Sequence, residues 1–117
     1  MINTSTGLLI EDKYILDYFE HLVDRFYKIL PIREEGMSDT LPKYMRSLQI
    51  ELIGCGGFVE ELRDISSYVS LLTTLQFLID NADLELSEYR REVFKSINIC
   101  KRLKLSYQKR LEREAAK

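Results

Sequence analysis

Apolar residues recur every three or four positions along most of this chain, the spacing that places side chains on one face of an α-helix. The pattern predicts four helices, at about residues 11–30, 40–62, 65–80 and 87–113. Amphipathic helices joined by short connections bury their apolar stripes best against one another. We therefore expect an all-α chain that folds as an antiparallel, up-down four-helix bundle.

Prolines indicate where the first two helices end and begin. Pro31 should end the first helix, because proline disfavours helical geometry in the residue before it. Residues 31–39 are accordingly predicted to form a loop. Thr40 is a good N-cap for the second helix, and Pro42 lies in its first turn, where a backbone N–H is not needed.

The second helix contains three glycines, Gly54, Gly56 and Gly57. Each glycine costs about 1 kcal/mol relative to alanine inside a helix. The apolar phase nevertheless continues from Leu41 to Leu62. This continuity favours one long helix, with a bend at the glycines left open, over two short helices.

The length of 117 residues fits one domain, residues 1–117, and we expect residues 1–10 and 114–117 to be frayed. An apolar fraction of 45% and a charged fraction of 31% are typical of a globular protein. No apolar run reaches the roughly 20 residues of a membrane helix, and the first residues do not resemble a signal peptide. We therefore expect no membrane contact. Cys55 and Cys100 lie on apolar helical faces and are expected to be reduced core thiols, which favours a cytoplasmic protein.

Two predicted helices are apolar on more than one side. The segment 65–79 contains no Asp, Glu, Lys, Arg or His, and its core stripe is expected to include Leu72 and Ile79, with Leu71 and Leu78 beside it. A helix with two apolar sides is usually buried on both. These helices either lie centrally in the bundle or contact another molecule, and we favour an interface between copies of the chain, where glycines let backbones approach closely. The candidate interface residues are Ile50, Ile53, Gly54, Gly57, Val69 and Phe77.

Charge is divided unevenly along the chain. Residues 1–87 contain 7 Lys/Arg and 15 Asp/Glu, whereas residues 88–117 contain 10 Lys/Arg and 4 Asp/Glu. At 100° per residue, basic residues of the fourth helix form one stripe. The stripe consists of Arg91, Lys95, Arg102, Lys109 and Arg113.

Three interpretations of this basic stripe remain open. It is the solvated face of an amphipathic helix, a surface that binds phosphates, or a surface that meets acidic residues of another copy, such as Asp17, Glu20 and Asp24. The sequence pI of about 5.5 is low for a dedicated nucleic-acid-binding protein. Nucleic acid is therefore the less favoured partner.

The sequence shows no pattern typical of a catalytic or metal site. The one histidine, His21, has Asp17 at helical spacing, which is too few ligands for a metal, and the Glu-x-x-His pattern of di-iron bundles does not occur. The glycine cluster lacks the Lys-Ser/Thr ending of a phosphate loop. We therefore expect no enzymatic activity, no cofactor and no metal.

The order of these features resembles the small four-helix-bundle accessory proteins of diversity-generating retroelements, the accessory variability determinants. The shared layout is an aromatic-rich first helix that ends in proline (residues 18–31, YFEHLVDRFYKILP), a second helix that reads LPKYMRSLQIEL (residues 41–52), an uncharged third helix and a basic fourth helix. The resemblance covers most of the chain and concerns layout. It implies a ring of bundles that engages a reverse transcriptase and nucleic acid through basic surface.

These features predict a non-enzymatic interaction protein that self-associates and serves an unidentified protein partner, as accessory subunit or adaptor of a larger protein machine. One alternative is a nucleic-acid-binding accessory protein of retroelement type that uses the basic fourth helix. The other is a small inhibitor encoded by a mobile element.

Overall fold

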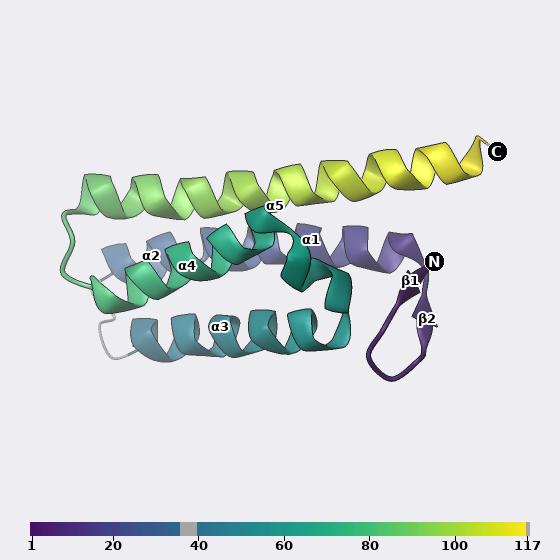
Figure 1. The fold of residues 1–117 in the computed structure, drawn as a ribbon. Coiled ribbons are helices and arrows are strands. Elements are labelled where there is room, and N and C mark those ends of the chain that lie inside the picture. Colours follow the sequence, from purple (N-terminus) through teal and green to yellow (C-terminus); the bar gives the residue numbers. More distant parts are fainter. Residues whose placement is uncertain (36–39, 117) are drawn as a thin grey trace.

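The computed structural model describes residues 1–35 and 40–116, and within them the chain is all-α apart from a short N-terminal hairpin (Figure 1). The four long helices of this part are α1 (Asp12–Tyr27), α3 (Thr40–Phe58), α4 (Ser66–Asp80) and α5 (Leu86–Ala115). The shorter elements are strands β1 (Ile2–Asn3) and β2 (Leu9–Ile10), helix α2 (Ile29–Glu34) and the 3-10 helix η1 (Glu60–Asp64). The all-α class predicted from the apolar spacing is confirmed.

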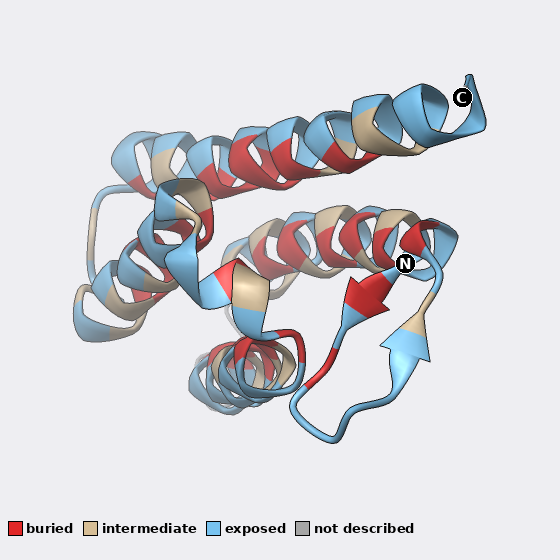
Figure 2. Cartoon of the chain, turned by 45° about the vertical axis from the view of Figure 1, so that its right-hand side comes forward, coloured by how far each residue is buried: buried red, intermediate tan, exposed pale blue. Residues whose placement is uncertain are grey.

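The long helices enclose one apolar core, and buried residues lie on the sides of the helices that face one another (Figure 2). Helix α5 packs against α1 and α4, and α4 also packs against α3. Phe19 and Phe26 of α1 are fully buried, and the Phe19 ring lies 5.8 Å from the Tyr107 ring of α5. Helix α3 lies at one edge of the molecule (Figure 1), so one of its sides faces away from the other described helices. None of the helices in the described part is both long enough and apolar enough to cross a membrane.

Pro31 does not end the first helix. Helix α1 ends at Tyr27, and Pro31 is the third residue of the short helix α2. In the first turn of a helix the backbone N–H groups have no partner within the helix, so a residue without one is tolerated there. The loop predicted for residues 31–39 is therefore wrong for residues 31–34, and residues 36–39 lie outside the described part of the chain.

The three clustered glycines lie within α3, as expected for one continuous helix. The helix ends earlier than predicted, at Phe58, because Val59 adopts a non-helical backbone conformation (φ −101°, ψ 87°). Val59 and Leu62 are still buried. The apolar spacing beyond Phe58 thus reflects packing of η1 against α3 and α4, and not a longer α3.

Helix α4 is turned about its axis relative to the prediction. Leu71 and Leu78 are fully buried, whereas Leu72 and Ile79, expected in the core stripe, are only partly buried. A helix that packs against both α3 and α5 buries the side between these two neighbours. Because α4 is apolar on most sides, its sequence alone does not specify that side.

Residues 1–10, which we expected to fray, instead form the antiparallel β1–β2 hairpin. Ile2 is 1% exposed and belongs to the core. The Ser5 N–H donates a hydrogen bond of 2.8 Å to the Phe58 carbonyl, which ties the hairpin to the end of α3. At the other end of the chain, α5 continues to Ala115, so the start of the C-terminal segment expected to fray is helical.

Candidate interaction surfaces

The outward side of α3, termed the α3 face, carries Ile50, Ile53, Gly54 and Gly57. Ile50 is 69% and Ile53 is 59% exposed, and both glycines are exposed as well. The alternative in which other helices of the same chain cover these residues is therefore wrong. Two adjacent isoleucines with most of their surface in water form an apolar patch of the kind found at protein contacts.

Packing within the chain does not explain the glycines of the α3 face. A Cβ atom added at Gly54 or Gly57 would have no heavy atom within 4 Å. Gly56 differs, because a Cβ there would lie 3.3 Å from Cε1 of Tyr68. Gly54 and Gly57 each cost the helix about 1 kcal/mol relative to alanine, and no contact in the described chain offsets that cost.

The outward side of α4 carries the other two candidate interface residues. Val69 is 48% and Phe77 is 41% exposed. A hydrogen bond between the side-chain amides of Gln49 and Gln76 joins α3 to α4. The candidate residues therefore lie on two neighbouring helices, and on each helix they are open to solvent.

Polar contacts hold the opposite flank of α3 against α1. The Tyr44 hydroxyl donates to the Arg25 carbonyl at 2.7 Å, and Arg25 Nη1 lies 3.5 Å from Glu51 Oε2. Glu51 is the one acidic residue within α3, and its charge faces Arg25. As a result, the α3 face is uncharged between Arg46 and the beginning of η1 at Glu60.

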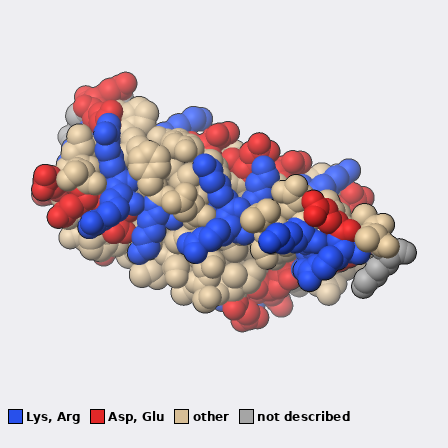
Figure 3. Space-filling model, turned by 90° about the horizontal axis from the view of Figure 1, so that it is seen from above, with Lys and Arg blue, Asp and Glu red and all other residues tan. Residues whose placement is uncertain are grey.

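All five residues of the predicted basic stripe are exposed on α5. Viewed from above, basic side chains follow one another along the molecule, with acidic groups mostly toward its edges (Figure 3). Lys95, 3.9 Å from Glu92, is the only one of the five that takes part in an ion pair among the described residues. Other basic residues of α5 are paired, such as Lys104 with Glu20 of α1. The stripe therefore presents cations that are largely unneutralised.

Two exposed aromatic rings lie on the flank of the stripe, and sequence reasoning missed them. Tyr27 of α1 and Phe94 of α5 are 40% and 42% exposed, with ring centroids 6.0 Å apart in an edge-to-face arrangement. Lys101 Nζ lies 6.0 Å from the centre of the Tyr27 ring. The one signal in the sequence was Phe94 itself, an aromatic residue on a predicted helix that is rich in basic residues.

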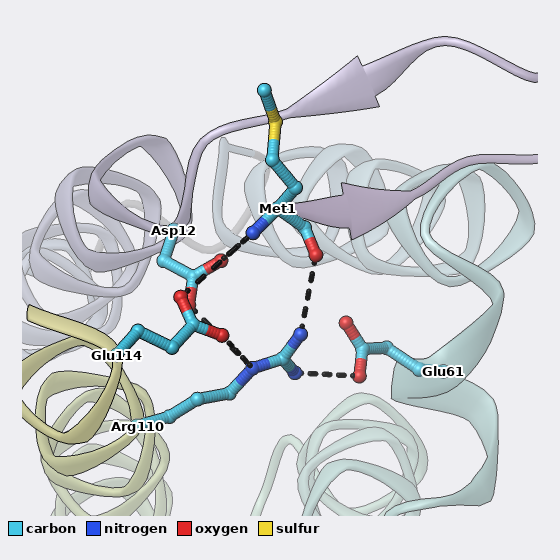
Figure 4. Close-up of polar contacts among 5 residues, drawn as sticks. All are labelled: Met1, Asp12, Glu61, Arg110 and Glu114. Atoms are coloured by element: carbon cyan, nitrogen blue, oxygen red, sulfur yellow. Dashed lines mark hydrogen bonds and ion pairs between the residues drawn. The ribbon is translucent and has the colours of Figure 1, made fainter. Parts of the chain in front are cut away.

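An ion cluster joins the hairpin, α1, η1 and α5 at one end of the molecule (Figure 4). The side chain of Asp12 is 1% exposed and lies 3.3 Å from the Met1 amine and 3.5 Å from Arg110 Nε. Arg110 also contacts Glu61 at 3.0 Å and Glu114 at 3.6 Å. In the sequence, Arg110 lies beside the basic stripe. In the structure, its guanidinium instead pairs with carboxylates of the same chain.

The cysteines do not form a reactive site. Cys100 is fully buried, and burial raises the pKa of its thiol to about 12. Burial also raises the pKa of the Cys55 thiol. Both thiols are therefore protonated at neutral pH and are poor nucleophiles.

The acidic neighbour of His21 comes from another helix and not from its own. His21 is half exposed and lies 3.7 Å from Glu51 of α3, which replaces Asp17 as its acidic neighbour. In the part of the chain that the structure describes, no three His, Cys, Asp or Glu residues are grouped closely enough to hold a metal ion.

Comparisons with protein-family models, with curated proteins and with solved structures gave no match to this chain. The exposed surfaces are therefore the basis for the function proposed next.

Proposed function

We propose that this chain is a non-enzymatic interaction protein, which self-associates and serves as accessory subunit or adaptor of a larger protein machine. The observation that carries the proposal is the α3 face, where Ile50 and Ile53 are the most exposed pair of large apolar residues on any one helix of the described chain. Burial in a contact removes this surface from water and contributes about 25 cal/mol per Å² of apolar area.

We further propose that the scaffold is an antiparallel four-helix bundle, with α2, η1 and the hairpin as additions. Successive long helices run in alternate directions in Figure 1, which supports this description. In such a bundle each helix keeps one side in water. On α3 and α4 that side carries exposed large apolar residues, and these two helices therefore supply the surface for a partner: Ile50 and Ile53 on α3, and Val69 and Phe77 on α4.

The substitution Ile53→Asp tests the proposal. A carboxylate at the centre of an apolar contact has to be desolvated, so we expect self-association to weaken at least about 100-fold. The matched control is Leu105→Asp, which introduces the same charge at an apolar residue of α5 that is 50% exposed. Light scattering over a dilution series measures both variants, and circular dichroism verifies their helix content. Equal association of Ile53→Asp and the unmodified protein would refute an interface on α3.

A second candidate function, binding of nucleic acid, is favoured by the basic stripe and its aromatic flank. Lysine and arginine release counterions when they neutralise phosphates, and exposed rings such as Tyr27 and Phe94 offer stacking surfaces for unpaired bases. The resemblance to accessory variability determinants also implies this function. The acidic first three quarters of the chain make it the weaker proposal.

Salt dependence tests this second candidate. We expect a labelled oligonucleotide to bind at low salt, and its affinity to fall steeply toward physiological salt. Replacing Arg91, Lys95, Arg102 and Lys109 with glutamine should abolish binding, whereas the same change at Lys43 and Arg46 of α3 should not. Fluorescence anisotropy measures the affinity, and absence of binding at low salt would exclude the function.

A further inference from the structure

The outward side of α5 carries a row of apolar side chains beside the basic stripe. Phe94 and Leu105 are both exposed, and they lie about three helical turns apart on α5. At 100° per residue they point in nearly the same direction, about 70° around the helix from the mean direction of the basic stripe. Tyr27 of α1 extends the row, because its exposed ring contacts that of Phe94. We term these three residues the apolar track.

No acidic residue interrupts this part of α5. Between Glu92 and Glu112 the helix contains lysine and arginine but no aspartate or glutamate. The basic stripe extends from Arg91 to Arg113, which is about 33 Å along a helix. Figure 3 looks onto this side of the molecule, and uncharged side chains lie between and beside the basic ones. A cationic surface and an apolar surface therefore run side by side along α5, and both are open to water.

We infer that this side of α5 holds a single strand of nucleic acid, with its phosphates on the basic stripe and its unpaired bases on the apolar track. The inference rests on the second candidate function proposed above, and it specifies the form of the nucleic acid and how it lies on the protein. A single strand presents charged phosphates and, beside them, bases whose flat faces stack on apolar side chains. The basic stripe and the apolar track match these two components.

A duplex matches the apolar track poorly. Its bases are stacked and paired in the interior, so a protein surface meets phosphates and the edges of base pairs. A base would have to leave the stack before it contacted Tyr27 or Phe94, and unstacking costs free energy. With α5 laid along the phosphates of an intact duplex, the apolar track would stay in water. We therefore expect single strands to bind more tightly than duplexes.

The ring pair is the most specific contact point on the apolar track. The centroids of Tyr27 and Phe94 are 6.0 Å apart, and Lys101 Nζ lies 6.0 Å from the centre of the Tyr27 ring. A base that stacks on these rings thus has a cation beside it for its own phosphate. Stacking tolerates every base, because each one has a flat face. We therefore expect little preference for sequence.

The form of the strand and removal of the rings test the inference. The probe is a labelled oligonucleotide without self-complementarity, compared at low salt with its duplex, and DNA and RNA are measured separately. We expect the single strand to bind at least about tenfold more tightly than the duplex. Replacing Tyr27 and Phe94 together with alanine should remove at least about tenfold of the single-strand affinity and change duplex affinity by less than about twofold.

Salt dependence separates the two surfaces, and fluorescence anisotropy measures it. The double alanine variant should keep the salt slope of the unmodified protein, because it loses no phosphate contact. Lys109→Gln should instead make the slope shallower by about 1 and weaken both forms of nucleic acid. The matched control is Tyr14→Ala, which removes an exposed tyrosine of α1 outside the apolar track and should change neither affinity. Circular dichroism verifies the helix content of each variant.

Two results would overturn the inference while nucleic-acid binding stands. One is equal affinity for the single strand and the duplex, and the other is undiminished single-strand binding by the double alanine variant. Absence of binding to every oligonucleotide at low salt would overturn the second candidate function and this inference together.

Discussion

Replacing Gly57 with leucine is expected to weaken self-association at least about 100-fold and to leave the folded monomer intact. A leucine side chain would project from the α3 face, which the proposed self-association buries. In the monomer the space beside residue 57 is empty, because a Cβ there has no heavy atom within 4 Å. The free energy of unfolding of the monomer should rise by up to about 1 kcal/mol, since leucine favours a helix more than glycine does.

Three comparisons make this prediction specific. Gly57→Ala adds one methyl group, and we expect a smaller loss of association with a similar gain in monomer stability. Gln108→Leu adds a leucine to an exposed position of α5, away from the candidate interface residues, and should leave association unchanged. Gly56→Leu should instead destabilise the fold, because its side chain would meet the Tyr68 ring, 3.3 Å from the Cβ position. Sedimentation measures association, urea unfolding at low protein concentration measures stability, and undiminished association of Gly57→Leu would contradict close contact at the α3 face.

The second large effect is expected at Arg110, where substitution by methionine should lower the free energy of unfolding by about 3 kcal/mol. The loss leaves the buried Asp12 carboxylate with the Met1 amine as its remaining cation. Asp12→Asn should cost less, about 1 to 2 kcal/mol, because the cations it leaves behind are partly in water. Urea unfolding of both single variants and of the double variant measures the coupling.

The double variant provides the decisive comparison. Once Asp12 is neutral, loss of Arg110 no longer strands a buried charge, so the double variant should cost less than the two single variants added together. Arg113→Met is the matched control, since Arg113 is exposed and should change stability by no more than about 0.5 kcal/mol. Additive costs at Asp12 and Arg110 would show that the cluster in Figure 4 does not act as a unit.

The apolar spacing was sufficient to predict the long helices, because a period near 3.6 residues is a property of the local chain. The spacing was insufficient to predict where helices end, because tertiary packing determines those positions. Nothing in the spacing distinguishes a longer α3 from the turn η1, since Val59 and Leu62 are buried in either case. The role of Pro31 was mistaken because proline is compatible with the first turn of a helix as well as with an end.

Exposure of the candidate surfaces followed from the sequence, whereas their surroundings did not. Ile50 and Ile53 could be assigned to the outward side because they are out of phase with the core stripe of the same helix. The contacts of Arg110 and the edge-to-face pair of Tyr27 and Phe94 join residues far apart in the chain. Such contacts depend on how the helices are arranged, which a single sequence does not specify.

Native mass is the most direct test of pairing between two copies of this chain. We expect light scattering of the unmodified protein at low salt to give twice the chain mass of 13.8 kDa, and to approach 13.8 kDa on dilution. A mass of 13.8 kDa at every concentration would contradict self-association, and a stable assembly larger than a dimer would contradict pairing through α3 alone.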